Sequence, residues 1–176
     1  DNICNTILLD TEMDIELKNN FFQKFIDLGY KFESNIILNL AIQLPEHNNI
    51  VNTLLSVIKP EIADVYIAIE YNKQNTFKII LDNGFDINSK SDNYDPIIFG
   101  CLNNPDLLSI LFEHNPDIDV LSNNNETCIW RACLSGCDET TQLLLDRGSD
   151  YAIRDETDNT LLMIGMYNEY IISPLL

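Results

Sequence analysis

Cysteine and histidine are the residues of this sequence that could do chemistry, either as metal ligands or as a nucleophile with its base. Three of the five cysteines lie close together at Cys128, Cys133 and Cys137, and the two histidines are His47 and His114. A zinc site is typically built from closely paired ligands, such as two cysteines separated by two residues, and that spacing is absent. A nucleophilic cysteine needs a base beside it, and no histidine or lysine falls near these cysteines in the repeat frame described below.

We therefore predict no catalytic residue, no metal site and no cofactor, and we interpret the cysteines as structural. Cys101 and Cys133 occupy the same place in consecutive repeats. A free thiol buried at such a place packs as a small apolar side chain. An enzyme that uses the cysteine cluster is the competing class. A thiol-reactivity assay separates the two, because buried structural thiols react only after unfolding.

The charge of the chain is strongly acidic. Ten Lys and Arg residues stand against 28 Asp and Glu residues, which gives a formal net charge of −18. No Lys or Arg occurs between Ser91 and Trp130. Such a surface repels phosphate backbones and anionic membranes and attracts basic proteins. We expect a protein partner, with basic proteins as the favoured kind, and no direct contact with nucleic acid or membrane. Solubility alone is the alternative explanation of the charge.

Length and composition indicate a folded chain, because 45% of its 176 residues are apolar. No stretch resembles a signal peptide, and no apolar run approaches the roughly 20 residues that cross a bilayer. The five irregularly spaced cysteines indicate reduced thiols rather than a disulfide framework. We therefore expect an intracellular, cytoplasmic protein, which would act in the host-cell cytoplasm if it came from a pathogen.

One short segment recurs along the chain. It reads LDNGFDIN at 81–88, FEHNPDID at 112–119 and LDRGSDYA at 145–152, with a looser copy, IDLGYKFE, at 26–33. Gly or Asn holds the fourth place of every copy, and steps of 31 and 33 residues join Gly84, Asn115 and Gly148. Such a residue after the last apolar position marks a helix end, because it adopts the left-handed conformation. Recurrence at this period indicates a stack of similar units.

A second, independent position confirms the period. Small residues recur at one place in the first helix of each unit, and from Ala68 onward the steps between them are 32, 32 and 33 residues. These small residues are Ala41, Ala68, Gly100, Ala132 and Gly165. Small side chains allow neighbouring helices to approach closely. Each unit therefore reads as a helix, a turn, a second helix and an extended loop.

This pattern resembles the ankyrin repeat, whose unit is an antiparallel helix pair followed by a hairpin loop. The copy TCIWRACLSGCDETTQLLLDRGSDYA at 127–152 looks like the family pattern T-P-L-H-x-A, G-H and L-L-x-x-G-A-D. The resemblance implies an all-α solenoid and a non-enzymatic role in protein–protein interaction. Trp130 takes the place where the family usually has His. The Trp130 side chain either packs between units or anchors a partner, and the sequence leaves both alternatives open.

The resemblance covers nearly the whole chain as one domain, 1–176, strongly from 63 to 165 and weakly at the ends. The expected units are about 1–33, 34–62, 63–94, 95–126, 127–159 and 160–176. The segment 36–62 lacks the glycine ending, so we expect its hairpin to be cut short. Terminal units differ because each has only one neighbour. The chain begins with Asp1 and closes on apolar residues. We therefore expect it to be part of a longer protein, with a self-contained chain as the alternative.

In the ankyrin family, partner contacts come mostly from the hairpin tips and the exposed end of the first helix. Position by position, the resemblance implies a partner-binding set from these places. Its members are Leu44, Tyr71, Ser91, Asp92, Tyr94, Leu102, Asn103, Asn123, Asn124, Glu126, Leu134, Ser135, Glu156, Asn159 and Tyr167.

Each unit places one large apolar residue at the end of its first helix. These residues are Leu44, Tyr71, Leu102, Leu134 and Tyr167. Aligned, they would form an apolar stripe flanked by acidic loops, and a stripe of this kind often marks an interaction site. We expect it to bind an apolar ridge or helix with basic flanks. The alternative is that some of these side chains fold back onto neighbouring helices.

The function favoured by the sequence is a monomeric, non-enzymatic module that binds a protein through its concave face. One alternative is an acidic inhibitor or immunity-type protein that neutralises a basic target. The other is an adaptor or targeting region of a larger protein. The sequence does not identify the partner, because a repeat scaffold fixes the fold and leaves recognition to surface positions.

Overall fold

The computed structural model describes residues 2–32, 35–44, 47–154 and 157–163. Every named element in this part of the chain is an α-helix. The contacts within the chain divide it into two compact units, residues 1–86 (unit 1) and 87–176 (unit 2).

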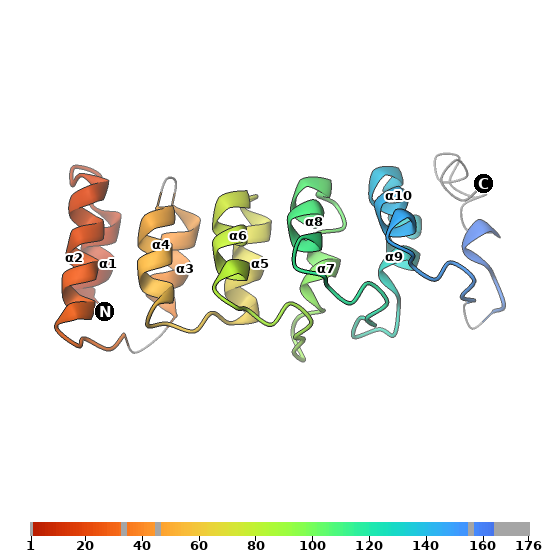
Figure 1. Cartoon of the computed structure of the whole chain (residues 1–176), viewed down its shortest axis with the longest axis horizontal. Coiled ribbons are helices and arrows are strands. Elements are labelled where there is room, and N and C mark those ends of the chain that lie inside the picture. The colour runs from red at the N-terminus through yellow and green to blue at the C-terminus, as the bar shows by residue number, and fades with distance from the viewer. Residues whose placement is uncertain (1, 33–34, 45–46, 155–156, 164–176) are drawn as a thin grey trace. The chain divides into compact units, whose positions relative to one another are not determined.

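Unit 1 contains three helix pairs (Figure 1). They are α1 (Asn2–Leu9) with α2 (Ile15–Asp27), α3 (Ile36–Gln43) with α4 (Asn48–Leu55), and α5 (Ile62–Glu70) with α6 (Gln74–Asp82). The first helices α1, α3 and α5 pack in order, and so do the second helices α2, α4 and α6. Unit 1 is therefore a stack of helix pairs, as the repeat predicts.

Unit 2 contains α7 (Ile97–Gly100) and α8 (Pro105–Phe112), followed by α9 (Cys128–Ser135) and α10 (Asp138–Asp146). The second helices α8 and α10 contact each other, and α9 packs on α10. The first helix of the earlier pair, α7, is a single turn that ends at Gly100. The repeat spacing places this helix correctly but gives no sign that it is so short.

The recurring Gly or Asn ends the second helix of its pair in the left-handed conformation. The backbone angle φ is 84° at Gly84, 53° at Asn115 and 86° at Gly148, and it is 77° at Gly29 in the looser copy. At Gly148 the turn is closed by the N–H of Ser149, which donates to the carbonyl of Leu144 at 3.1 Å. The predicted role of this position as a helix end is confirmed.

Short polar side chains begin several of the helices. The Asp14 carboxylate accepts the N–H groups of Glu16 and Leu17 at the start of α2, at 2.7 and 3.3 Å. Asn104 does the same for α8, where its Oδ1 accepts the N–H of Leu107 at 3.1 Å. Both side chains satisfy N–H groups that have no partner within their own helix.

The small-residue position lies in the core, as the repeat implies. Ala41, Ala68 and Ala132 are at most 1% exposed, which lets the first helices approach closely. Gly100 is half-buried, and Gly165 lies outside the described residues. The rest of the core consists of Leu, Ile, Val and Phe from the inward faces of each pair.

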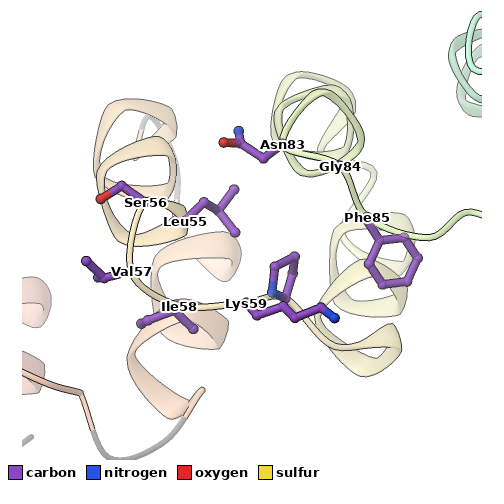
Figure 2. A pocket seen from close by; sticks show the side chains of 9 residues that line it. Leu55, Ser56, Val57, Ile58, Lys59, Asn83, Gly84 and Phe85 are labelled. Carbon is purple, nitrogen blue, oxygen red and sulfur yellow. The ribbon is translucent and has the colours of Figure 1, made fainter.

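The second repeat lacks a hairpin loop. Only residues 56–61 join α4 to α5, whereas residues 83–96 join α6 to α7. Figure 2 shows the short segment after α4 and the residues that line a hollow beside it, residues 55–60 and 83–85. The volume of this hollow is about 290 Å³. The expectation that this hairpin is cut short agrees with the structure. Lys59 and Phe85 are among the residues that line the hollow.

Candidate functional site

Most of the cysteine side chains occupy core positions, as small apolar side chains would. Cys101, Cys128 and Cys133 are fully buried, and no cysteine of the chain forms a disulfide. Burial raises the pKa of the Cys101 thiol to about 12 and raises the pKa of Cys128 and Cys133 as well. A buried thiol with a raised pKa stays protonated at neutral pH, so it is a poor nucleophile and a poor metal ligand.

Cys137 is the partly accessible member of the cluster. Its Sγ lies 3.2 Å from Oδ1 of Asn103 and donates its hydrogen there. Burial, and then the carboxylate of Asp138, raise the pKa of this thiol. Over the described residues, no group of three or more His, Cys, Asp or Glu side chains is arranged to hold a metal ion. Within the same part of the chain, no helix is long and apolar enough to cross a membrane.

Two members of the predicted apolar stripe are open to solvent. Tyr71, at the end of α5, is 50% exposed, and Leu134, in the last turn of α9, is 49% exposed. Leu44 is half-buried. Tyr167 and the hairpin residue Glu156 lie outside the described residues.

Leu102 does not belong to an exposed stripe, and this part of the prediction is wrong. Only 3% of its surface is exposed. Because α7 ends at Gly100, Leu102 lies in the turn after the helix rather than on its outer face. The hydroxyl of Thr140 in α10 also donates to the carbonyl of Leu102 at 2.7 Å and holds this turn against the next pair. Its neighbour Asn103 remains exposed.

Several hairpin residues of unit 2 bind the neighbouring hairpin. Ser91 and Tyr94 exchange main-chain hydrogen bonds at 3.1 and 3.2 Å and close the first hairpin. Asn123 of the next hairpin donates from its side chain to the carbonyl of Ser91 at 3.1 Å, and from its main chain to the Asp95 carboxylate at 2.6 Å. These residues therefore fix the spacing of the hairpins. Asp92 beside them is exposed.

Arg131 on α9 joins these hairpins through an ion-pair cluster. Its Nη1 donates to Asp95 Oδ2 at 2.6 Å, and its Nε and Nη2 donate to Glu126 Oε2 at 3.0 and 2.8 Å. The guanidinium also lies over the ring of Phe99, 4.6 Å from the ring centre. Glu126, predicted to contact a partner, is thus already paired within the chain.

The cluster shifts the pKa of Asp95 and of Arg131. Burial would raise the pKa of Asp95, but the N–H of Asn123 and the Arg131 guanidinium together lower it. Burial opposes the charge of Arg131, yet the hydrogen bonds to Asp95 and Glu126 raise its pKa. Asp95 and Arg131 therefore both stay charged at neutral pH.

A hollow of about 440 Å³ lies between two successive hairpins of unit 2. Its lining comes from both hairpins and from α9, and comprises Leu121, Asn124, Asn125, Glu126, Thr127, Trp130, Ile153 and Arg154. Trp130 is 9% exposed, so its ring packs mostly within the protein while lining part of the hollow. Leu121 is 44% exposed and adds to the apolar part of the wall.

Trp130 and Leu134 lie one helical turn apart on α9, so they share a face of that helix. We group Leu134 with residues that line the hollow and call the group the α9 surface: Leu121, Asn124, Trp130, Leu134 and Ile153. Ser135 beside Leu134 is exposed, and Asn159 is half-buried with its amide donating to the hydroxyl of Thr157 at 2.6 Å. The sequence placed Asn124 and Leu134 in the partner-binding set and left Trp130 open, but it missed Leu121 and Ile153.

Unit 1 has a smaller counterpart beside Tyr71. A hollow of about 360 Å³ is lined by Leu44, Asn48 and residues 72–76. Most of these side chains are polar, and Asn48 already accepts a hydrogen bond from Thr76 at 2.8 Å. The α9 surface has the larger apolar share and is the better candidate for a binding site.

The role of Arg131 was missed by the sequence analysis. One signal was available, because Arg131 is the first basic residue after the stretch without Lys or Arg that ends at Trp130. A single cation among many carboxylates is placed to pair with some of them. Which carboxylates these are depends on the fold, since Asp95 lies a whole repeat away in the sequence.

Comparison with known families and structures agrees with this architecture. A family model described as ankyrin repeats in three copies matches residues 65–155, just over half of the chain. A search of curated proteins finds no match. Among solved structures, 196 chains match. One is the crystal structure of the ankyrin repeat domain of Bcl-3, described as a unique member of the IkappaB protein family. It covers 98% of this chain and 96% of its own, with a TM-score of 0.66 and 15% identity. At that identity the likeness shows the fold alone.

Proposed function

This chain belongs to the ankyrin repeat family, whose members are generally protein-interaction modules, and from that premise we propose that it binds a protein partner through the α9 surface. The observation that carries the proposal is the exposure of Leu121, in the wall of the hollow that Trp130 also lines, and of Leu134, one helical turn from Trp130. The framework of α9 does not need apolar side chains in solvent. An exposed apolar group rimmed by polar residues is typical of an interaction site.

The partner we propose is an apolar segment or helix with basic flanks. Apolar side chains of the partner would enter the hollow beside Trp130, where desolvation favours strong anchoring. Basic flanks are favoured by the net charge of −18 and by exposed carboxylates of unit 2 such as Asp92 and Asp119. Glu126 contributes little to this attraction, because Arg131 already pairs with it. Exposed charges act mainly on the association rate and are screened by salt.

The same acidity favours a second candidate function. A monomeric acidic inhibitor would neutralise a basic target by itself and needs no other domain. An adaptor region of a larger protein would instead hold its partner for another domain. The two uses differ in whether binding of the isolated chain is enough to block the activity of the partner.

We also propose that the protein works in a reducing intracellular compartment such as the cytoplasm. The support is the set of free cysteines, three of which are fully buried without pairing. Thiols left unpaired in this way are typical of proteins that fold under reducing conditions.

The experiment is affinity capture with the wild-type chain and a Leu134→Asp variant, followed by measurement of the captured partner's Kd. Leu134 is exposed, so the variant should fold normally, and we expect its binding to weaken about tenfold or more. Val57→Asp is the matched control, because Val57 is also 49% exposed but lies in unit 1 on the loop after α4.

Each comparison gives a distinct result. Loss of binding in Leu134→Asp but not in Val57→Asp supports the α9 surface. Equal binding by all three chains contradicts it. A Kd of the wild-type complex that rises steeply with salt supports a basic partner. A Kd that does not change with salt indicates that apolar contacts with the α9 surface provide most of the attraction.

A further inference from the structure

One residue in the wall of the hollow beside Trp130 departs from the repeat. Leu121 is the sixth residue after the one that ends the second helix of its pair. In the repeats before and after it, the sixth residue is basic, Lys90 and Arg154 respectively. The leucine is 44% exposed, so the core of the protein does not require it. The replacement of a basic residue by an apolar one therefore changes the chemistry of the hollow rather than the fold.

The loop that carries Leu121 is fixed on both sides of this residue. Ser122, which follows it, is buried, and its hydroxyl accepts the N–H of Glu126 at 3.1 Å. The N–H of Ser122 donates in return to the carbonyl of Glu126 at 2.9 Å. Two residues before Leu121, the Asp119 carboxylate accepts the N–H of Asp150 in the next loop at 3.3 Å. A partner therefore meets Leu121 in a segment that is already ordered, which lowers the entropic cost of binding.

Both charged side chains that line this hollow are paired within the chain. Glu126 Oε2 accepts hydrogen bonds from Nε and Nη2 of Arg131 at 3.0 and 2.8 Å. Arg154 donates from Nη1 to the carbonyl of Asp158 at 3.0 Å, and the same nitrogen lies 3.2 Å from the Asp158 carboxylate. A charged side chain that entered the hollow would lose water and would meet only charges that already have a partner. The hollow therefore disfavours a charged occupant.

The apolar side chains of the wall come from three separate segments. Trp130 of α9, Leu121 of the loop before α9 and Ile153 of the loop after α10 all line the hollow. Its volume of about 440 Å³ is at the low end of the range of about 300–1,000 Å³ for small-molecule sites. A space of this size suits one large side chain, and the transfer of an apolar side chain from water into it stabilises the complex.

We propose that Leu121 determines the specificity of the α9 surface. With Trp130 and Ile153 it selects one large apolar side chain of the partner, of the size of leucine or phenylalanine, and that side chain fills the hollow. This inference rests on the proposed function, because it names the residue type that the partner presents to the same site. The basic flanks of the partner lie outside the hollow, where exposed carboxylates such as Asp92 remain.

The repeat supplies a substitution that separates a specificity role from a structural one. Leu121→Lys restores the residue type that the neighbouring loops carry at Lys90 and Arg154, so it is compatible with the loop conformation. The variant removes apolar surface from the wall and brings a charge to it. A structural role for Leu121 predicts that this variant loses stability. A specificity role predicts that stability is kept and that selection of apolar side chains is lost.

The test adds four small probes to the isotopically labelled full chain, namely the N-acetyl amides of leucine, phenylalanine, lysine and glutamate. Trp130 is the single tryptophan of the chain, so its indole N–H gives one signal in a ¹H–¹⁵N correlation spectrum. We expect the leucine and phenylalanine amides to shift this signal saturably, with a Kd in the millimolar range that suits such small ligands. The lysine and glutamate amides should bind at least about tenfold more weakly.

Two variants of Leu121 and one control complete the test. In Leu121→Lys the Kd of the leucine amide should rise about tenfold or more, and in Leu121→Ala it should rise about threefold or more, because each removes apolar contact area. Val57→Lys is the matched control, since Val57 is 49% exposed but lies in unit 1, and it should leave this Kd unchanged. Circular dichroism and the exchange of α9 amides should match the wild-type chain in all three variants.

Equal binding of all four amides overturns the proposal, and so does an indole signal that none of them shifts. A Kd of the leucine amide that both Leu121 variants leave unchanged also overturns it. These measurements need no natural partner, whereas the capture experiment with Leu134→Asp does. A chain that selects the apolar amides but captures no protein keeps the selective hollow and loses the proposed function. A chain that captures a partner through Leu134 without selecting the apolar amides keeps the proposed function and loses this inference.

Discussion

The two units of this chain join their helix pairs by different polar chemistry. In unit 1 the links between the second helices are neutral, with Thr53 bonded to Asn19, Thr76 to Asn48 and Asn83 to Asn52, and one carboxylate, Asp64, accepts the amide of Asn35. In unit 2 the neutral bond from Thr140 to Leu102 is joined by ion pairs, in which Arg131 is paired to Asp95 and Glu126. The apolar core is alike in both units. We infer that burial of apolar side chains stabilises the stacking of the helix pairs in both units. The polar links instead determine how the stability of each unit depends on pH and salt.

The loops show the same contrast. In unit 2, side chains of one loop accept N–H groups of the next, as Asn88 does for Asp117 and Asp119 does for Asp150, at 3.0 and 3.3 Å. In unit 1 the second repeat has only residues 56–61 in place of a hairpin, and a hollow remains there (Figure 2). The loops of unit 2 are therefore cross-linked beside the α9 surface, which suits a preformed binding site.

The largest expected effect tests whether the cores are equivalent. Ile80 and Leu144 both lie four residues before the helix-ending glycine of their repeat, and both are fully buried. Truncation of either to Ala should cost about 2–5 kcal/mol, because it removes buried methyl groups and leaves a cavity. Urea unfolding together with amide exchange measures the loss in each unit. A cost near zero at one site and a large cost at the other would show that the two cores differ.

The next effect tests the polar contrast directly. Arg131→Ala leaves two partly buried carboxylates without their partner and should cost about 1–3 kcal/mol. Asn83→Ala removes a neutral, exposed link and should cost at most about 0.5–1.5 kcal/mol. The free energy of unfolding of the two variants is compared at low and high salt. Only the loss of stability caused by Arg131→Ala should become smaller at high salt. Equal salt sensitivity of the two variants would contradict the difference between the units.

The smallest effect is a pH dependence of opposite sign in the two units. The lowered pKa of Asp95 means that its stabilisation is complete above the ordinary pKa of 3.8 and is lost as pH falls through the lowered value. Asp64 in unit 1 is 1% exposed, and burial raises its pKa above 3.8. Unit 1 therefore loses stability as pH rises from 3.8 through the raised pKa of Asp64.

The pH prediction is checked by urea unfolding of Asp95→Asn and Asp64→Asn across the acidic range. Each variant should lose the pH dependence of its own unit and keep that of the other. The Asp64 side chain also accepts, through Oδ2, the N–H of Glu61 at 2.6 Å and the amide of Asn35 at 3.0 Å, and the side-chain oxygen of an Asn can accept both bonds. If the stability of both variants depended on pH as that of the wild-type chain does, Asp95 and Asp64 would not be the groups responsible.

The repeat frame could be predicted from the sequence because its signals are local. The glycine or asparagine at helix ends needs only its own backbone conformation, and the small residues of the first helices recur at a fixed step. Both features are confirmed at Gly84, Asn115 and Ala68. The same local signals could not show that α7 stops after one turn, so the exposed position assigned to Leu102 was wrong.

The candidate site was only partly predictable, because its polar contacts join residues about a repeat apart. Asn123 and Glu126 were assigned to a partner, yet in the structure they bind Ser91, Asp95 and Arg131. The repeat spacing says which residues are near a hairpin tip. The repeat spacing does not show which of these residues already form hydrogen bonds with the neighbouring hairpin. The assignment of Tyr71, Leu134 and Asn124 to partner binding stays a prediction.

The measurement that tests the central claim most directly is amide hydrogen exchange of the full chain alone and with its captured partner bound. We expect slower exchange on binding in residues 121–135, which carry the second hairpin of unit 2 and α9, with exchange in α2 unchanged. Protection confined to other parts of the chain, with residues 121–135 unaffected, would contradict it.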